Sequence, residues 1–260
     1  MFELEGKSVV ITGAGGGIGE VLVDTFLAAG AKVIACDRSG AVFKAAAQLN
    51  GTVFFDLTDS PGTRDAAASL IGSFGVPDIL VSNAGFTRGD YFELVTEQLW
   101  RDELELNLTG VRNFADPLIA AMIGRGGGTQ VFIATINGLA HYGHPAYSVA
   151  KAGLIAYMKA IAVEHGRRGI RANAVCPGSV RTAAWDHRIV EQPDLMERAS
   201  RYYPLGRLVT PQEVANAALF LASPLSSGIT GTTLAVDGGL TAGNLRFVDD
   251  IVRAPVLNAE

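Results

Sequence analysis

Tyr147 and Lys151 form the pair of side chains in this sequence that is best suited to moving a proton. They lie four residues apart in HPAYSVAKAGLIAYMKAIAVEHG, a segment whose periodicity after Pro145 predicts a helix. Residues with this spacing share one helix face, so the ammonium can approach the phenol. A phenol has a pKa of about 10, and a nearby cation lowers that pKa by stabilising the phenolate. The pair therefore predicts a general acid and base, although the same spacing is common in surface pairs.

A glycine-rich turn, TGAGGGIG at residues 12–19, follows the first apolar run and precedes a segment with helical periodicity. In a doubly wound sheet this turn brings backbone N–H groups close to a pyrophosphate, which only residues without a Cβ permit. The common G-x-G-x-x-G spacing fails at Ile18, whereas a longer T-G-x-x-x-G-x-G spacing fits. We predict that Gly13, Gly17, Ile18 and Gly19 bind a dinucleotide; the alternative is a plain glycine-rich loop.

Acidic residues end the second and third apolar runs. Asp37 closes KVIACD, where a carboxylate can accept hydrogen bonds from both ribose hydroxyls and repels a 2′-phosphate. This position favours NAD over NADP, although the neighbouring Arg38 could turn toward a phosphate. Asp56, in FFDLT, is either a contact to the adenine amino group or a turn residue.

The elements that must position these residues alternate along the chain. Short β-branched runs are separated by longer alanine-rich segments, which is typical of a parallel sheet covered by helices on both faces. Ser60 before Pro61, and Thr210 before Pro211 with Glu213 completing a capping box, predict two helix starts. We expect strands, apolar on both faces, near residues 7–12, 32–37, 52–55, 79–82, 129–135, 171–175 and 232–236. The prediction is a single α/β domain over residues 1–260, a doubly wound Rossmann fold of about seven parallel strands.

The composition suits a buried sheet and a small-molecule substrate. Hydrophobic residues make up 48% and charged residues 18% of the chain, and the net charge of -5 without a basic run argues against nucleic acid. Cys36 and Cys176 lie in apolar runs without metal-ligand spacing, so we expect buried thiols and no metal site. The acidic N-terminus and its short apolar run favour a cytoplasmic protein that does not span a membrane.

Five motifs appear in register: TGAGGGIG, NAG at 83–85, Asn107, YSVAK at 147–151 and PGSVRT at 177–182. Together they resemble the short-chain dehydrogenase/reductase family, from about Gly6 to Gly239. The resemblance implies an oxidoreductase that moves a hydride between a nicotinamide and an alcohol or ketone carbon. Its catalytic residues map onto Tyr147, Lys151, Thr135 and Asn107. Threonine stands where the family usually has serine, which keeps the hydroxyl but adds a methyl group.

The resemblance also implies further roles. Lys151 would hydrogen-bond the nicotinamide ribose, and Asn107 would maintain a proton path to solvent. Relatives are commonly homotetramers, and the tail at residues 240–260 could cross to a neighbouring subunit. Further cofactor contacts are implied at Asp56, Leu57, Asn83, Ala84, Gly85, Pro177, Gly178, Val180 and Thr182.

The irregular insertion at residues 183–206 occupies the place of the family's substrate lid. Its tyrosines, tryptophan and arginines suit a polyol, sugar or cyclic alcohol, but a surface helix pair with inward aromatics fits equally well. The expected substrate contacts are Asn137, His144, Trp185 and Tyr203, with Thr87, His141 and Tyr142 as further candidates.

Two other functions remain open. An NADPH-dependent 3-ketoacyl-thioester reductase would share every catalytic residue, and Asp37 argues against it. The second is a catalytically weak, NAD-binding regulatory or scaffold protein. The threonine at position 135, where the family usually has serine, is the feature that supports this hypothesis.

Overall fold

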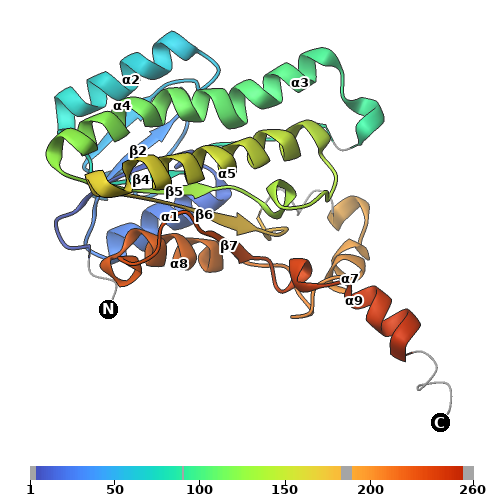
Figure 1. The fold of residues 1–260 in the computed structure, drawn as a ribbon. Helices are drawn as coiled ribbons and strands as arrows, with labels where there is room; N and C mark the ends of the chain where they lie inside the picture. Colours follow the sequence, from blue (N-terminus) through green and yellow to red (C-terminus); the bar gives the residue numbers. More distant parts are fainter. Residues whose placement is uncertain (1–3, 90, 183–188, 254–260) are drawn as a thin grey trace.

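The computed structural model describes residues 4–89, 91–182 and 189–253, which form one α/β domain around a parallel sheet (Figure 1). The sheet has seven strands in the order β3-β2-β1-β4-β5-β6-β7. The strands are β1 Ser8–Thr12, β2 Lys32–Asp37, β3 Gly51–Phe54, β4 Ile79–Ser82, β5 Gly128–Ile133, β6 Ile170–Pro177 and β7 Thr233–Val236. This topology confirms the predicted doubly wound Rossmann fold.

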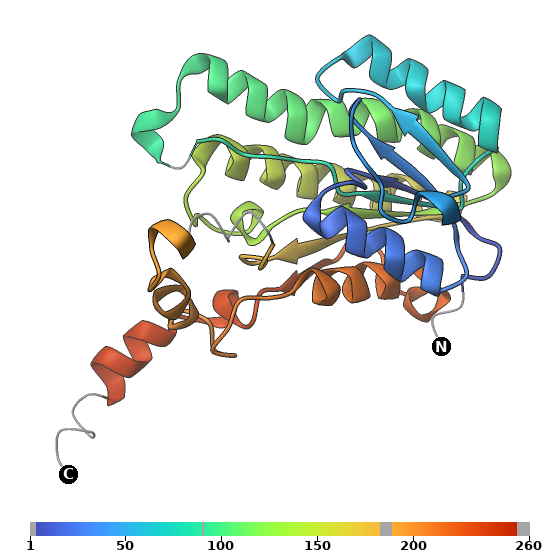
Figure 2. The same ribbon diagram turned by 180° about the vertical axis from the view of Figure 1, so that it is seen from behind.

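Helices cover both faces of the sheet, as Figures 1 and 2 show from opposite sides. The helices α2 Ser60–Phe74, α4 Gly110–Arg125 and α5 Pro145–His165 lie on one face, and α1 Gly17–Ala28 and α8 Pro211–Ala222 lie on the other. Successive residues of β1 alternate between the two cores: Val10 packs in the first, and Val9 and Ile11 pack in the second. This alternation follows from the strand pleat, so the central strands are apolar on both faces.

Several local predictions differ from the structure, and β6, for example, ends at Pro177 rather than near residue 175. The edge strand β3 is not buried on both faces: Thr52 and Phe54 are exposed, and Gly51 and Val53 are only partly buried. The strand β5 ends at Ile133, two residues earlier than predicted. The N-cap of α2 is Asp59 rather than Ser60, because its side chain accepts a hydrogen bond from Gly62 N. The Thr210 capping box is confirmed.

The long helix α5 is a core element. With the turn that follows it, it spans Pro145–Arg168 and is long and apolar enough, by length and composition, to cross a membrane. Its Leu154 and Met158 are buried among the side chains of one core, so packing against the sheet explains its apolar character. Cys36 and Cys176 are buried free thiols as predicted.

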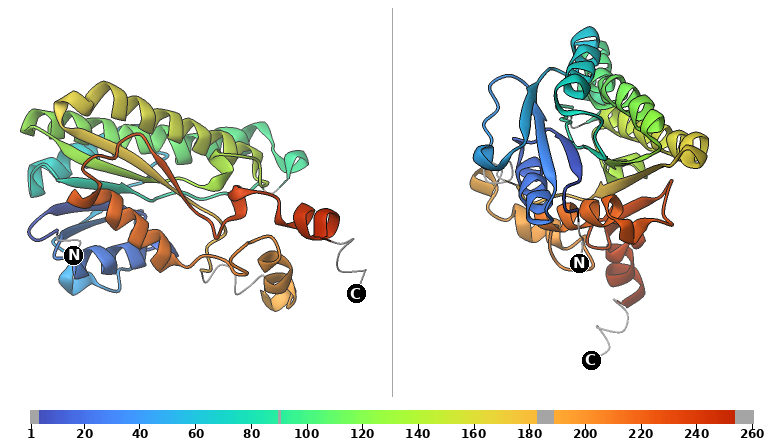
Figure 3. Two further views of the ribbon diagram at one scale, coloured as in Figure 1. Left: turned by 60° about the horizontal axis from the view of Figure 1, so that its bottom comes forward. Right: turned by 90° about the vertical axis from the view of Figure 1, so that its left-hand side faces the viewer.

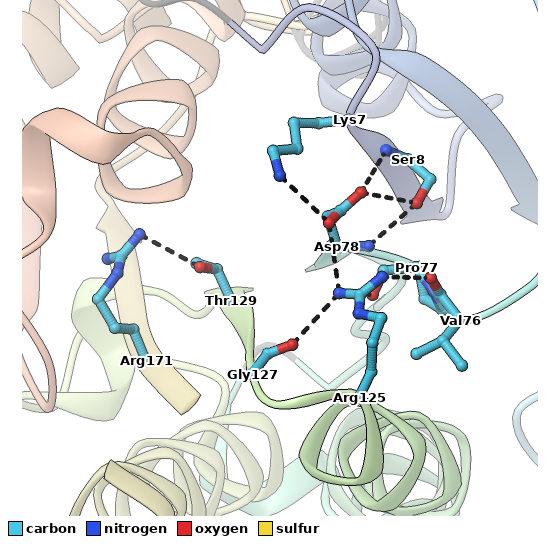
Figure 4. A network of polar contacts seen from close by, with 9 residues as sticks. All are labelled: Lys7, Ser8, Val76, Pro77, Asp78, Arg125, Gly127, Thr129 and Arg171. Carbon is cyan, nitrogen blue, oxygen red and sulfur yellow. Dashed lines mark hydrogen bonds and ion pairs between the residues drawn. The ribbon is translucent and has the colours of Figure 1, made fainter. Parts of the chain in front are cut away.

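An ionic cluster fastens the edge of the sheet where the strands begin (Figure 4). Asp78 precedes β4 and accepts hydrogen bonds from Ser8 N at 2.9 Å and Ser8 Oγ at 3.0 Å, which join it to β1. Arg125, at the end of α4, lies 3.3 Å from the same carboxylate, and Lys7 lies 3.5 Å from it. The cluster therefore ties β1, β4 and α4 together on the side away from the glycine turn.

The remaining elements lie toward the end of the sheet where the strands finish. The helix α3 Glu97–Leu104 continues through a π turn, Glu105–Thr109, into α4. The short α7 Leu195–Ser200 belongs to the predicted lid, and α9 Leu245–Phe247 continues as a π turn, Val248–Arg253. The α9 segment projects away from the body of the molecule (Figure 3).

Candidate active site

The loops that follow β1, β4, β5 and β6 meet at one edge of the sheet. Parallel strands place their carboxyl ends on the same side, and the strand order reverses direction next to β1. The glycine turn, the NAG segment, Thr135 and the PGSVRT segment all lie on these loops. The fold therefore brings together motifs that are far apart in the sequence.

The glycine turn depends on close backbone packing. Gly13 has a positive φ of 64°, and a Cβ there would lie 2.8 Å from Ala84 Cα. A Cβ on Gly19 would overlap Gly13 O, so α1 can pack onto the turn only without a side chain at this position. Gly17 faces Thr182, whose side-chain carbons would be 3.2 Å from an added Cβ. The turn and the PGSVRT segment therefore face each other closely.

The residues around this turn fit a dinucleotide. The N-cap of α1 is Gly16, which has no side chain to hydrogen-bond the first N–H groups, and such groups favour an anion. Asp37 Oδ2 accepts a hydrogen bond from Gly15 N at 2.9 Å, so its carboxylate lies beside the turn. A phosphate-binding helix start next to an acidic group suits the pyrophosphate and a ribose diol.

Two residues predicted to contact the cofactor, Asn83 and Ala84, also brace the turn. Asn83 Nδ2 donates to Thr12 O at 3.1 Å and to Gly13 O at 3.0 Å. Thr12 Oγ1 accepts hydrogen bonds from the backbone N–H groups of Asn83 and Ala84, both at 3.1 Å. These contacts give the NAG segment a structural role.

Asp56 makes the contacts of a turn residue. Its Oδ1 accepts hydrogen bonds from Thr58 N at 2.9 Å and Thr58 Oγ1 at 2.7 Å, and these bonds lower the pKa of the Asp56 carboxyl. The adjacent Leu57 is buried, and a Cβ on Gly110 would clash with its backbone. Of the two interpretations of Asp56, the contacts favour the turn.

Tyr147 and Lys151 lie together on α5, as their spacing predicts. Lys151 Nζ is 5.6 Å from the centre of the Tyr147 ring and donates a hydrogen bond to Ile133 O, at the end of β5, at 3.0 Å. The lysine is only 2% exposed, so β5 fixes its ammonium inside the site. The ammonium therefore points toward the phenol and the loop edge of the sheet.

The electrostatics of the pair differ from the prediction. Burial raises the pKa of Tyr147 above its ordinary value, and the charges of Glu103 and Cys176 raise it further. Burial lowers the pKa of Lys151 to about 8, although Cys176 and Glu103 oppose this change. The predicted lowering of the Tyr147 pKa is not seen in this arrangement, because desolvation and the charges of Glu103 and Cys176 all act in the opposite direction. Tyr147 is a neutral phenol with a proton to donate.

Thr135 begins the short turn Ile136–Gly138, with its backbone extended and its side chain 8% exposed overall. Its Oγ1 accepts a hydrogen bond from Asn137 N at 3.2 Å and lies 3.4 Å from Pro177 O. Asn137 Nδ2 in turn donates to Gly143 O at 2.8 Å. Asn137 thus holds the loop that leads into α5.

Asn107 is completely buried in the π turn between α3 and α4. A Cβ on Gly85 would lie 2.8 Å from Asn107 Oδ1 and 3.2 Å from Lys151 Nζ, so these two polar atoms flank the same glycine. Asn107 and Lys151, which were expected to share a proton path, therefore lie close together, and the NAG segment lies beside them. Glu103, only 4% exposed, is a neighbour that the sequence analysis missed. Its i, i+4 spacing to Asn107, which places the two residues on one helix face, could have indicated this contact.

The remaining residues predicted to contact substrate lie in different surroundings. Tyr203 is 4% exposed, and its hydroxyl accepts a hydrogen bond from Ser179 N at 3.0 Å. It packs inward, as the alternative interpretation expects, and its contact with substrate stays a prediction. His144 lies in the loop before α5, with Nδ1 3.0 Å from Gly89 O and its ring 6.4 Å from that of Tyr147. Trp185 lies outside the described residues.

The PGSVRT segment is anchored by backbone contacts. Gly178 N donates to Val236 O at 3.0 Å, following the pairing of Pro177 with β7. Val180 forms an isolated parallel bridge with Val209. These contacts leave Thr182 as the side chain of this segment that faces the glycine turn.

Comparison with known proteins finds similar sequences and similar folds over most of the chain. The family model described as Enoyl-(Acyl carrier protein) reductase matches residues 13–241. The chain is 41% identical over 251 residues to an uncharacterized oxidoreductase of Schizosaccharomyces pombe, covering 95% of this chain and 96% of that protein. It is 37% identical to the 3-oxoacyl-[acyl-carrier-protein] reductase of Chlamydia pneumoniae, covering 92% of this chain and 98% of the relative.

Solved structures give the same result. A short-chain dehydrogenase/reductase family oxidoreductase from Burkholderia thailandensis is 42% identical, with a TM-score of 0.85 and coverage of 97% of this chain and 98% of the other. A gluconate 5-dehydrogenase from Burkholderia cenocepacia, in complex with NADP and tartrate, is 30% identical, with a TM-score of 0.86 and coverage of 93% and 98%. Since relatives of this identity align from the glycine turn through the Tyr147–Lys151 helix and beyond, the chain belongs to the short-chain dehydrogenase/reductase family of oxidoreductases.

Proposed function

We propose that this protein is an NAD-dependent dehydrogenase/reductase that interconverts a secondary alcohol, of the polyol, sugar or cyclic alcohol class, and its ketone. The observation that carries the proposal is the position of Lys151 Nζ, 5.6 Å from the Tyr147 ring and fixed on Ile133 O. A buried ammonium held near a phenol ring, at the end of β5, supports a role for this pair in proton transfer. Bound nicotinamide would supply or accept the hydride there.

The chain's own residues divide the remaining work. Tyr147, held neutral by burial, donates its proton to the oxygen of a ketone and recovers it from the product alcohol in the reverse direction. Lys151 stabilises the phenolate that forms after donation, because its ammonium is already in place. Thr135 offers a hydroxyl on the adjoining loop that can orient the substrate oxygen.

Asp37 supports NAD as the cofactor. Its carboxylate is held beside the glycine turn by Gly15 N, where a 2′-phosphate would meet a negative charge. Replacing Asp37→Ser removes this repulsion, so we expect the ratio of kcat/KM for NADP to that for NAD to rise about tenfold or more. Steady-state kinetics with both cofactors measure this ratio, and an unchanged ratio would contradict the cofactor assignment.

The reaction class is tested by a screen of sugars, polyols, cyclic alcohols and hydroxyacids with NAD⁺, following the absorbance of the reduced cofactor. The variant Tyr147→Phe keeps the ring but lacks the proton, so we expect its kcat to fall about 10²-fold or more while calorimetric NAD affinity stays within about twofold. Substantial residual kcat in this variant would sink the proposed role of Tyr147.

A second candidate is supported by the relative from Chlamydia pneumoniae and by the description of the matched family model: reduction of a 3-ketoacyl thioester. It uses the same residues and differs in substrate and cofactor. Including acetoacetyl thioesters with NADPH in the screen separates the two. NAD binding without turnover of any substrate would instead favour the regulatory hypothesis.

A further inference from the structure

Glu103 is a buried carboxylate that the proposed mechanism does not use. It lies near the end of α3 and is 4% exposed. Within the described residues no Lys, Arg or His approaches it closely enough to form an ion pair, and such burial of a charge is costly unless hydrogen bonds offset it. Apolar packing alone therefore does not explain a carboxyl group at this buried position.

Two donors offset the burial, one for each carboxylate oxygen. Glu103 Oε1 accepts a hydrogen bond from Arg88 N at 2.7 Å, and Oε2 accepts one from Asn107 Nδ2 at 2.9 Å. The first bond holds the loop after β4, and the second holds the side chain beside Lys151. One acidic group thus joins α3, this loop and the π turn.

The contacts determine which way the Asn107 amide faces. Asn107 Nδ2 also donates to the backbone oxygens of Phe86, at 2.9 Å, and Glu103, at 3.1 Å, while Oδ1 accepts a hydrogen bond from Phe86 N at 3.2 Å. With its nitrogen surrounded by acceptors, the amide presents its oxygen to the side of Gly85 that also borders Lys151 Nζ. A flipped amide would place its NH₂ group beside Phe86 N, donor against donor.

The same carboxylate supports the loop next to the phenol. Arg88 N is fixed by Glu103, and the adjacent Gly89 O lies 3.0 Å from His144 Nδ1. His144 precedes α5 and packs its ring edge-on to Tyr147. The contacts therefore connect Glu103 to both sides of the Tyr147–Lys151 pair.

We propose that Glu103 is a positioning residue of this site, which orients Asn107 and anchors the loop at residues 86–89 beside the Tyr147–Lys151 pair. Only the expected change in kcat rests on the function proposed above. The negative charge of Glu103 also bears on the ionisation of Lys151, which can be measured without turnover.

The charge effect is tested by the titration of Lys151. The titratable groups that bear on this ammonium in the described parts of the chain are Tyr147 on α5, Glu103 on α3 and Cys176 on β6. The pKa of Lys151 is about 8, and the charge of Glu103 raises it against the effect of burial. In Glu103→Gln, we expect the midpoint followed by ¹³Cε NMR of labelled lysine to fall by about half a pH unit or more.

Matched variants separate charge from position. Glu103→Gln keeps the size of the side chain, but an amide can accept from only one of the two donors, so we expect kcat to fall about tenfold or more. Glu103→Asp keeps the charge but is too short to reach both donors, so the Lys151 midpoint should remain near that of the parent while kcat falls. Glu105→Gln removes the same charge two residues away, where Glu105 accepts from Ser60 Oγ at 3.0 Å, and should change neither.

The results distinguish this proposal from the proposed function. A Lys151 midpoint that is the same in Glu103→Gln, Glu105→Gln and the parent would overturn the proposal, whatever the rates. A loss of kcat in Glu103→Gln accompanied only by a lower melting temperature would overturn it too, since that is a purely structural role. A parent protein that oxidises or reduces no substrate would contradict the proposed function and leave the NMR titration to decide the role of Glu103.

Discussion

At the scale of single residues, the start of α1 depends on the missing Cβ of Gly19. Any side chain there overlaps Gly13 O, and because the obstacle is backbone it cannot turn aside. We expect Gly19→Ala to lower the free energy of unfolding by about 3 kcal/mol and to abolish measurable NAD binding. Urea unfolding and calorimetric titration with NAD measure both effects.

Gly72 is the matched control for this substitution. It lies inside α2, and an added Cβ would find no atom within 4 Å. Alanine is favoured over glycine in a helix interior, so Gly72→Ala should raise the free energy of unfolding by about 1 kcal/mol and leave NAD affinity unchanged. Equal effects of the two substitutions would show that close packing at Gly19 is not what the turn requires.

At the scale of elements, the Asp78 cluster makes the union of β1, β4 and α4 sensitive to acid. Burial opposes ionisation of Asp78, but hydrogen bonds from Ser8 and the charges of Arg125 and Lys7 outweigh it and lower the carboxyl pKa below its ordinary value. A carboxyl whose pKa is lower in the folded state stabilises the fold fully above its unfolded pKa. That contribution is lost as pH falls through the folded pKa.

We expect Asp78→Asn to lower the free energy of unfolding at pH 7 by about 1 to 2 kcal/mol. The difference from the parent should shrink as pH falls below about 4, because the parent carboxyl then becomes neutral. Urea unfolding from pH 7 to 3 measures the difference in unfolding free energy between the variant and the parent. Asp65→Asn, on the exposed surface of α2, is the control. A difference that stays constant with pH would mean that the carboxylate charge does not contribute.

The same scale shows what the sequence could predict. The central strands were placed correctly because their apolar runs are long and bounded by turns, as in β2 Lys32–Asp37 and β4 Ile79–Ser82. The exposed alternate residues of β3 were not predicted, since its position at the sheet edge depends on strand order. The cap at Asp59 was missed because both Asp59 and Ser60 are good N-cap residues.

The site could be predicted where its residues share a helix turn or a motif, as Tyr147 and Lys151 do. The raised pKa of Tyr147 could not be predicted from the sequence. It depends on burial by other elements and on Glu103 and Cys176, which come from distant segments. Glu103 itself looks like an ordinary charge on a surface helix. The π turn and the loop after β4 supply its hydrogen-bond donors, Asn107 and Arg88 N, and both segments reach it only in the tertiary fold.

At the scale of the whole molecule, the segment from Leu245 to Arg253 stands apart from the two cores. These cores are built from described residues up to Val236, whereas α9 and the turn after it project outward (Figure 3). Phe247, Ile251 and Val252 are each more than half exposed. Apolar side chains gathered on a projecting segment are typical of a surface that another chain covers.

We propose that the protein is a homotetramer and that this segment contributes to its assembly. Deleting residues 244–260 removes the exposed Phe247, Ile251 and Val252, and no residue of Asn244–Arg253 belongs to either core, so the melting temperature at high dilution should change by no more than about 3 °C. The mass measured by light scattering should fall from that of a tetramer to that of a smaller species, because less apolar surface is buried between subunits. The variant Arg246→Ala, which removes the ion pair to Asp250 but keeps the apolar surface, is the control. A truncated protein with the mass of the parent would exclude the segment from the interface, and a parent that is monomeric would exclude the tetramer.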